Sequence, residues 1–359
     1  MKGYYSLKIL YVDTAYSGHH FKYFKSLVSN IDLGEKVAVY PNKAPLDNII
    51  RYHLEGDFKR FSIIKYIIWI ITVYIIVKNE KPDIIHFLYG DFFYRYFGLL
   101  LWVFKKQKVI ITFHHVKKSK IRDISLKHIC KNVTKAVVHT RKLKLDLNGI
   151  GIYNVEHIEY PVFIDKKIKE KIPDDIILDK CKNAKILLSL GATRYDKGLD
   201  ILLEALKNVE IDFRLIIAGT ESDIKLDQIK ELTDSYKDKV FIHMDYLSES
   251  EYIGLIQMSD IIVLPYRKVF DGASGPLTEA VYFSKIIIGP NHGSLGQIIS
   301  DNCLGSTFES ENIFDLAESI KKELTQTMLL SNKYFEYQHS LLESNFVSQY
   351  EKNYKLLVE

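Results

Sequence analysis

The sequence predicts an α/β protein with two doubly wound domains, each a parallel sheet covered by helices. Short apolar, β-branched runs alternate with longer amphipathic stretches along the whole chain, which is typical of repeated βα units. The series of strand-like runs begins afresh near residue 185. A length of 359 residues also exceeds what one hydrophobic core usually serves, so two domains are expected.

The expected strands form two series. The strands expected in the first half are Ser6–Val12, Lys36–Tyr40, Asp83–Phe87, Lys108–Phe113, Ala136–His139 and Val155–Glu159. Those expected in the second half are Lys185–Leu190, Phe213–Ala218, Val240–Met244, Ile261–Leu264 and Lys285–Ile288. Because ligands of doubly wound sheets bind beyond the carboxyl ends of the strands, the loops after these strands are expected to hold the functional residues.

The chain is expected to divide into residues 1–165, residues 166–335 and a C-terminal helix within 336–359. Asp165–Lys182 is rich in Lys, Asp and Glu and contains Pro173, so it is interpreted as the connector between the domains. Tyr334–Leu357 predicts a helix with aromatic side chains along it.

One strongly apolar segment, Tyr66–Val77, is bounded by Lys65 and Lys78. It is too short to span a membrane, which takes about 20 apolar residues. The pattern favours a buried helix of the first domain, and a partly exposed helix that touches a bilayer is the alternative. The similarly apolar run Phe92–Phe104 is followed directly by three lysines.

Composition narrows the possible classes of protein. Hydrophobic residues at 47% and charged residues at 26% describe a globular domain. Three scattered cysteines indicate neither a disulfide framework nor a zinc site, and the 12 histidines show no metal-ligand spacing. No bound metal is therefore expected. The first residues contain no long apolar segment or cleavage site, so a cytoplasmic protein is expected.

Charge is distributed unequally. Residues 1–165 carry 26 Lys and Arg against 14 Asp and Glu, whereas residues 166–359 carry 23 against 31. The basic half predicts anionic partners: a phosphorylated substrate, nucleic acid or an acidic membrane surface. Nucleic acid is disfavoured because the basic cluster adjoins aliphatic runs and no recognition module is visible.

A cationic loop follows the first strand of the second series. In this loop Arg194 and Lys197 stand between Gly191 and Gly198, which allow close backbone approach. Arg offers a planar fork and Lys a compact charge, so the pair predicts a phosphate or diphosphate site. The alternative is a solvated basic turn.

The segment Ile262–Gly289 holds a strand, a glycine-broken loop and a helix start around two carboxylates, Asp271 and Glu279. Pro276 suits the first helical position, and the amides of Leu277 and Thr278 are expected to point outward after Gly275. Such a helix start attracts phosphate. Glu279 either stabilises the helix start generically or accepts hydrogen bonds from a ribose.

These motifs resemble those of family four of the retaining GT-B glycosyltransferases, also known as glycosyltransferase group 1. GATRYDKG is similar to the family's glycine, arginine and lysine loop, and Asp245–Tyr266 resembles its nucleobase region. PDIIHFLYGD and VIITFHH resemble strands of its N-terminal domain. The resemblance implies two Rossmann-like domains facing a cleft, acceptor binding in the first, donor binding in the second, and a C-terminal helix that returns to the first domain.

The resemblance also implies residue roles. Arg194 and Lys197 hold the diphosphate, Glu279 the ribose and Asp271 the transferred sugar, with Asp where the family has Glu. His114 matches a histidine near the sugar, although His115 beside it is the alternative. Gly18 matches a glycine loop that approaches the diphosphate. Gly219 ends a strand, LIIAG, that reaches the same cleft.

The expected function is transfer of a hexosyl group, with retention, from a UDP- or GDP-sugar to a glycan or lipid-linked acceptor in polysaccharide or glycolipid synthesis. No cofactor or metal is expected, and peripheral attachment to the inner face of the membrane follows from the basic half. A non-hydrolysing sugar-nucleotide epimerase and a non-catalytic scaffold for glycan synthesis remain alternatives. A nicotinamide dehydrogenase is disfavoured because YVDTAYSGHH lacks GxGxxG.

Overall fold

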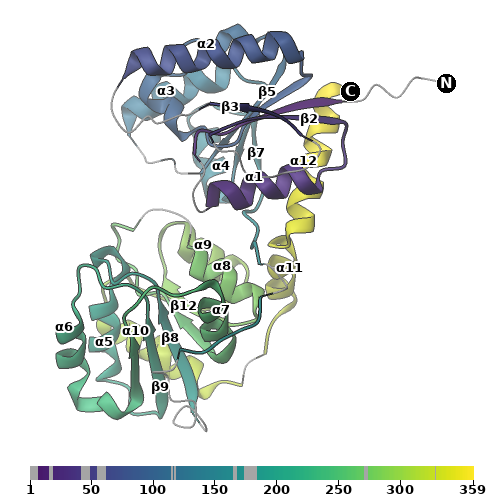
Figure 1. The fold of residues 1–359 in the computed structure, drawn as a ribbon. Helices are drawn as coiled ribbons and strands as arrows, with labels where there is room; N and C mark the ends of the chain where they lie inside the picture. Colours follow the sequence, from purple (N-terminus) through teal and green to yellow (C-terminus); the bar gives the residue numbers. More distant parts are fainter. Residues whose placement is uncertain are drawn as a thin grey trace. The chain divides into compact units, whose positions relative to one another are not determined.

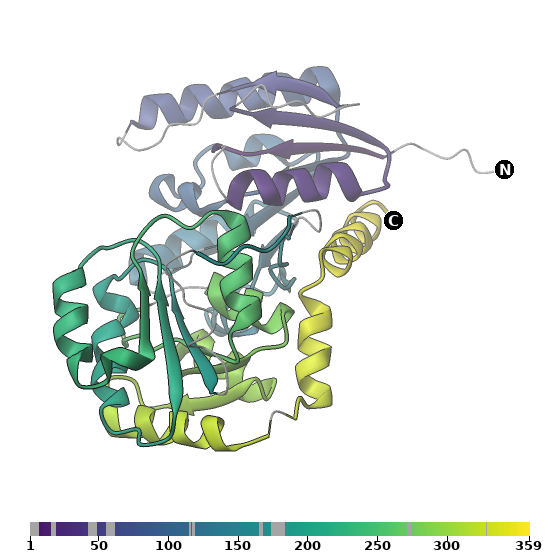
Figure 2. The same ribbon diagram turned by 60° about the horizontal axis from the view of Figure 1, so that its bottom comes forward.

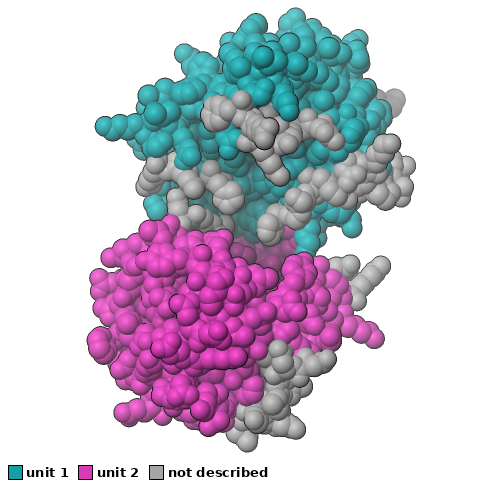
Figure 3. Space-filling view, turned by 60° about the vertical axis from the view of Figure 1, so that its left-hand side comes forward, with its two compact units in different colours: residues 1–161, 343–359 teal, residues 162–342 magenta. Residues whose placement is uncertain are grey.

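The computed structural model describes residues 7–15, 19–41, 49–54, 62–114, 116, 119–164, 168–173, 184–270, 274–327 and 329–359. The chain forms two compact units, coloured separately in Figure 3. Residues 1–161 and 343–359 make up the first unit, and residues 162–342 the second.

The first unit is built on a seven-stranded parallel sheet with the order β3-β2-β1-β4-β5-β6-β7 (Figure 1). Its strands are β1 Lys8–Val12, β2 Glu35–Tyr40, β3 Ile50–His53, β4 Ile84–Phe87, β5 Lys108–Phe113, β6 Lys135–Val138 and β7 Val155–His157. Its helices are α1 His19–Asn30, α2 Ile63–Glu80, α3 Lys120–Lys131, α4 Arg141–Gly149 and α12 Glu343–Val358, with 3₁₀ turns η1 Asp91–Tyr96 and η2 Leu101–Phe104.

The second unit repeats this plan with six parallel strands in the order β10-β9-β8-β11-β12-β13 (Figure 2). The strands are β8 Lys185–Leu190, β9 Phe213–Ala218, β10 Val240–His243, β11 Ile261–Val263, β12 Ile286–Pro290 and β13 Gly305–Phe308. The helices are α5 Leu199–Leu206, α6 Leu226–Thr233, α7 Glu249–Met258, α8 Gly275–Tyr282, α9 Gly293–Asp301, α10 Ile313–Thr325 and α11 Asn332–Ser340, with 3₁₀ turns η4 Tyr195–Lys197 and η5 Asp234–Lys239.

Both sheets bury apolar side chains on each face, as parallel sheets require. In the first unit one face packs against α2, η1, η2 and α3. On the other face, α12 brings Tyr350 to within 2.5 Å of the Tyr23 hydroxyl of α1 and brings Tyr354 to within 2.6 Å of His86 Nδ1. The C-terminal helix therefore returns to the first unit, and the expected pair of α/β domains is confirmed.

The C-terminal region differs from its prediction in one respect. The single helix expected over 334–357 is wrong, because the structure has two helices separated at Leu341 and Leu342. Leu341 is fully buried in the second unit, and its carbonyl oxygen accepts a hydrogen bond of 2.9 Å from the amide of Val162. This anchoring ends α11 in the second unit, whereas α12 belongs to the first.

The expected connector Asp165–Lys182 lies mostly outside the described residues. Its described part, residues 168–173, packs on α7 of the second unit. The amide of Lys171 donates to the carbonyl of Ser250 at 3.1 Å, and the Lys171 side chain pairs with Glu251 at 3.1 Å.

Candidate functional site

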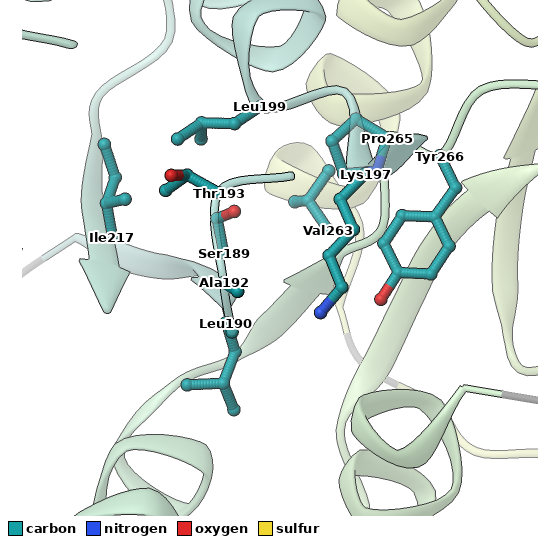
Figure 4. A pocket seen from close by; sticks show the side chains of 11 residues that line it. Ser189, Leu190, Ala192, Thr193, Lys197, Leu199, Ile217, Val263, Pro265 and Tyr266 are labelled. Atoms are coloured by element: carbon teal, nitrogen blue, oxygen red, sulfur yellow. The ribbon is translucent and has the colours of Figure 1, made fainter. Parts of the chain in front are cut away.

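The candidate site lies at the carboxyl edge of the second sheet, where β8 and β11 are neighbours although they are not consecutive in the sequence. The connections after these strands leave in opposite directions, which opens a crevice at such switch points. The loop 191–198 follows β8, and residues 264–270 follow β11. A pocket there is lined by Ser189, Leu190, Gly191, Ala192, Thr193, Lys197, Leu199, Ile217, Val263, Pro265 and Tyr266 (Figure 4).

Glycines let the loops of this edge pack directly on one another. Gly219 has φ +140°, and a Cβ on it would lie 2.3 Å from the carbonyl oxygen of Gly191. Gly198 has φ +65°, and a Cβ there would lie 2.1 Å from the carbonyl oxygen of Pro265. No side chain fits at either position, so these two glycines hold the β8 loop against the ends of β9 and β11.

Lys197 extends over this glycine-lined backbone. A Cβ on Gly191 would lie 2.5 Å from its Nζ, and the same Nζ lies 5.9 Å from the centre of the Tyr266 ring. Figure 4 shows the amine and the Tyr266 hydroxyl side by side. Burial first, and the charge of Arg194 second, lower the pKa of Lys197. A bound anion would relieve both effects, because it returns a counter-charge to a desolvated cation.

Arg194 does not stand as an unpaired cation. Its Nε and one terminal nitrogen donate to the two carboxylate oxygens of Asp196 at 2.9 and 2.6 Å. Its side chain is half exposed. An anion at this loop would therefore compete with Asp196 for the guanidinium, whereas Lys197 has no such carboxylate pairing among the described ion pairs.

Arg267 fixes the loop, and sequence reasoning missed it. This buried side chain donates to both carboxylate oxygens of Asp200 at 3.0 and 2.6 Å and to the carbonyl of Tyr195 at 2.6 Å. Its guanidinium carbon also lies 4.0 Å from the centre of the Tyr195 ring. Arg267 therefore fixes the position of the 3₁₀ turn that carries Lys197. Nothing local in the sequence pairs positions 200 and 267.

The start of α8 has fewer free backbone amides than the sequence analysis predicts. Helix α8 begins at Gly275, with Ser274 as the residue that caps it. The amide of Leu277 donates to Ser274 Oγ at 3.4 Å, and the amide of Thr278 donates to the Ser274 carbonyl at 3.3 Å. The prediction that these two amides point outward is wrong, because the serine cap already accepts from the first turn.

Ser274 nevertheless links this helix start to the lysine. Its hydroxyl lies 3.4 Å from the hydroxyl of Tyr266, the ring beside which Lys197 lies. Burial raises the pKa of Tyr266 to about 12, so the hydroxyl keeps its proton as a donor. Pro276 occupies the second helical position and Gly275 the first, and Gly275 is exposed.

Glu279 lies in the first turns of α8 and folds back toward its start. A Cβ on Gly275 would lie 3.5 Å from Glu279 Oε2. The same oxygen accepts a hydrogen bond of 2.5 Å from the hydroxyl of Tyr252 on α7. Tyr252, which sequence reasoning did not single out, thus orients the carboxylate beside the helix start. Asp271 lies outside the described residues.

The corresponding edge of the first sheet carries aromatic rings. Tyr89 is sandwiched between His20 and His114, with ring centres 3.5 and 3.7 Å away and interplanar angles of 21° and 6°. Tyr23 and His139 approach His114 at 5.1 and 4.7 Å between ring centres. The ring cluster, defined as these five residues, follows the ends of β4, β5 and β6 together with the start of α1.

His114 is held in one orientation within the ring cluster. Its Nε2 lies 2.9 Å from the carbonyl oxygen of Leu88, and its amide donates to Asp91 at 3.2 Å. Because a carbonyl oxygen only accepts, Nε2 carries a proton in this contact. The alternative residue, His115, and the predicted Gly18 both lie outside the described residues.

Asp13 and His20 form a pair to which the sequence analysis assigned no role. Asp13 follows β1 and is buried. Its Oδ1 lies 2.9 Å from His20 Nδ1 and also accepts hydrogen bonds from the amides of Thr14 and Ala15. Burial raises the pKa of Asp13. The pair holds the His20 ring against Tyr89 and so supports the stacking around His114.

In the described part of the chain, no group of three or more His, Cys, Asp or Glu side chains is placed to hold a metal ion. None of the helices in the described ranges is both long and apolar enough to cross a membrane.

Comparisons with known proteins agree with this architecture. Residues 171–339 match the family model of glycosyl transferases group 1. Glycogen synthase of Thermodesulfovibrio yellowstonii is 28% identical over 200 residues, which cover 51% of this chain and 39% of that protein. The matched region spans about two-fifths of the length of such curated relatives.

Solved structures show the same fold over nearly the full chain. A glycosyltransferase from Rickettsia africae ESF-5 superposes with a TM-score of 0.70 at 19% identity, covering 99% of this chain and 100% of that one. Anabaena Alr3699/HepE in complex with UDP and glucose gives a TM-score of 0.67 at 13% identity, covering 97% and 99%. Residues 171–339 of this chain therefore match glycosyl transferases group 1, and the chain as a whole has the GT-B fold.

Proposed function

We propose that the protein transfers a hexosyl group, with retention, from a UDP- or GDP-sugar to a hydroxyl of a glycan or lipid-linked acceptor. The observation that carries this proposal is the Lys197 amine, held over the Gly191 backbone beside Tyr266 at the switch point of the second sheet. A desolvated cation on a side-chain-free surface suits a diphosphate. Anabaena HepE, which shares the fold, has been solved with UDP and glucose.

The chemistry requires stabilisation of the departing diphosphate. The bond between the sugar carbon and the diphosphate oxygen breaks, and a bond from the same carbon to the acceptor oxygen forms. Lys197 neutralises the developing charge, and Arg194 joins it by turning from Asp196 to phosphate. The leaving phosphate oxygen takes the acceptor's proton on the same face, which gives retention. Glu279, oriented by Tyr252, accepts from the ribose hydroxyls.

The remaining expected residues take supporting roles in this proposal. Asp271 contacts the transferred sugar, and His114 lies near the same sugar. Gly18 and the loop after Gly219 approach the diphosphate, and the start of α8, from Gly275 through Pro276, Leu277 and Thr278, contributes its dipole rather than free amides. No metal or other cofactor takes part, so turnover in EDTA should equal turnover in added Mg²⁺.

The experiment has two stages. A thermal-shift panel of UDP, GDP and their hexose conjugates identifies the nucleotide, because a ligand at about 100 times its Kd stabilises the folded state by about 2.7 kcal/mol. NMR of the product then gives the anomeric configuration. An inverted product would overturn the mechanism, and conversion of the donor without any acceptor would identify an epimerase instead.

We also infer a site of action at the inner face of the cell membrane in polysaccharide or glycolipid synthesis. The support is the excess of 26 Lys and Arg over 14 Asp and Glu in residues 1–165. Basic groups near an anionic bilayer are attracted to it, and a lipid-linked acceptor would be presented there.

A further inference from the structure

Helix α2 of the first unit is apolar on all sides, but the unit covers only one of them. Its inner face buries Tyr66, Trp69, Val73 and Val77 against the sheet and the η1–η2 region. Among the described residues, no helix or strand of this unit lies beyond its outer side (Figures 1 and 2). A helix that is hydrophobic all round is normally buried or in contact with lipid, so the uncovered side calls for a partner.

The uncovered side is a continuous line of isoleucines. Ile64, Ile68, Ile71 and Ile75 are spaced four, three and four residues apart, which places them on one line along a helix. Their exposed fractions are 67%, 58%, 48% and 53%. We call these four residues the isoleucine stripe. An 18-residue helix is about 27 Å long, and the stripe from Ile64 to Ile75 covers about 17 Å of that length.

A second exposed apolar group lies next to α2. The Tyr66 hydroxyl donates to the carbonyl of Leu99 at 2.6 Å, and the Tyr74 ring lies 6.3 Å from that of Phe104. These contacts fix the segment that carries Leu99 and Trp102, which are 41% and 56% exposed. An exposed Trp beside an aliphatic stripe is typical of side chains at a membrane interface.

The charges around the stripe are basic. Lys65 and Lys78 lie at the two ends of α2, and Lys105 and Lys106 follow Trp102; all four are exposed. The carboxylates of the same region are engaged elsewhere. Glu80 pairs with Lys8 at 2.7 Å, Asp83 accepts from the Lys8 amide at 2.8 Å, and Asp91 accepts from the His114 amide at 3.2 Å.

We propose that the isoleucine stripe and Trp102 form a docking surface on which the protein lies on an anionic lipid bilayer, with the flanking lysines contacting lipid phosphates. The apolar side chains enter the boundary between headgroups and acyl chains, and the basic groups remain at headgroup level. A second copy of the chain fits less well, because a twofold contact along α2 would bring Lys65 of one copy toward Lys78 of the other. The inference rests on the membrane site proposed above and is independent of the donor chemistry.

Vesicle flotation of the full chain tests the proposal without donor or acceptor, so failure of the glycosyl-transfer proposal would leave this result unaffected. Wild type should float with phosphatidylglycerol-containing phosphatidylcholine vesicles and much less with pure phosphatidylcholine. I68E/I71E should lose at least tenfold in partition coefficient. The matched control is Phe314→Glu, which changes a 72% exposed apolar side chain of the second unit and should bind as wild type does.

A second pair of variants separates charge from apolar contact. Each basic group near an anionic bilayer contributes about fivefold to binding, so Lys65→Ala with Lys78→Ala should lose about 25-fold on anionic vesicles. Lys333→Ala on α11 is the control. Circular dichroism and a thermal melt without ligand verify that each variant is folded. The proposal would be overturned if both double variants bound vesicles as wild type does, or if wild type bound neutral and anionic vesicles equally. It would also be overturned if wild type were a dimer that did not bind vesicles and that I68E/I71E converted to a monomer.

Discussion

The carboxyl edges of the two sheets have the same topology but different chemistry. At the edge of the second sheet, glycines bring backbones together and carboxylates organise the cations: Asp196 holds Arg194, and Asp200 holds Arg267. At the edge of the first sheet, rings stack on one another and a histidine is fixed by a carbonyl. A diphosphate needs organised positive charge, whereas a sugar hydroxyl or ring needs apolar faces and single acceptors. The contrast supports our proposal that the diphosphate leaving group binds to the second unit.

The strongest test of the charged edge is Lys197→Ala. Turnover should fall by about a hundredfold or more, because one preorganised charge at a developing oxyanion is worth about that much. Stability should change little, since burial already lowers the pKa of Lys197 and disfavours its charged form. Steady-state kinetics with the donor found by thermal shift, and a melt of each variant, provide the measurement.

Lys207→Ala is the matched control for this variant. Lys207 lies just beyond α5 in the same unit and pairs with Glu204 at 2.8 Å on the exposed surface. Its loss should leave turnover within twofold of wild type. If Lys197→Ala behaved like this control, the diphosphate would have to bind elsewhere.

Arg267→Ala should have the next largest effect. The side chain is 7% exposed and makes three charge-assisted hydrogen bonds to Asp200 and Tyr195. Removing it leaves Asp200 unpaired and should lower the free energy of unfolding by about 2–3 kcal/mol. Because the turn that carries Lys197 is then unsupported, UDP affinity should fall as well. Urea unfolding and isothermal titration measure the two effects.

Arg214→Ala supplies the comparison for Arg267. Arg214 also pairs with an aspartate, Asp212, at 2.8 Å, but Asp212 is 57% exposed and also pairs with Lys239 at 3.4 Å. Its removal should cost no more than about 1 kcal/mol and leave UDP affinity unchanged. Equal effects of the two variants would remove Arg267 from its positioning role.

The strands that could be predicted from the sequence are those with continuous apolar runs. All eleven expected strands are present, whereas β3, with the sequence IRYH, and β13, with GSTF, were missed. Both lie at sheet edges, where one side of the strand has no partner strand and the apolar pattern is weak. The edge strands β7 and β10 were predicted, so what β3 and β13 lack is an apolar run: IRYH is not buried at any position, and GSTF has a single large apolar residue.

The site residues that could be predicted are those in local motifs, whereas those paired by tertiary packing were missed. Lys197 was found because its loop is a local motif, but Arg267 and Asp200 are 67 residues apart, and Tyr252 and Glu279 are 27 apart. Such pairs are set by tertiary packing, which no local spacing reports. The prediction of free amides at the start of α8 failed for a different reason. The serine that caps them was present in the sequence at position 274, directly before the glycine and proline.

Acid should destabilise the first unit through His86. Burial lowers the pKa of this histidine to about 3, and its two nitrogens lie 2.6 Å from the Tyr354 hydroxyl and 2.9 Å from the Thr112 hydroxyl. The unfolded chain protonates near its ordinary value of about 6.5. Below that pH the unfolded state binds a proton that the folded state does not, so stability should fall by about 1.4 kcal/mol for each pH unit.

Urea midpoints between pH 7.5 and 5 measure this effect in wild type and in His86→Gln, which keeps a donor and an acceptor but does not titrate. The variant should show the shallower dependence on pH. His128→Gln, on the exposed surface of α3, should keep the wild-type slope. A slope in His86→Gln equal to that of wild type would place the acid sensitivity outside the first unit's buried histidine.

The smallest effect is expected for Tyr252→Phe, which tests whether donor binding at the carboxyl edge of the second sheet also depends on an oriented carboxylate. The Tyr252 hydroxyl donates to Glu279 Oε2 at 2.5 Å. Its loss removes the restraint on a carboxylate that, in the proposed function, binds the donor equally in the ground state and the transition state. The donor KM should rise about fivefold with kcat unchanged, since one hydrogen bond contributes about 1 kcal/mol. Tyr246→Phe, at a side chain 80% exposed before α7, should change neither constant. A fall in kcat instead would mean that Glu279 acts on the reacting centre, and the division between nucleotide anchoring and charge stabilisation within the second unit would have to be redrawn.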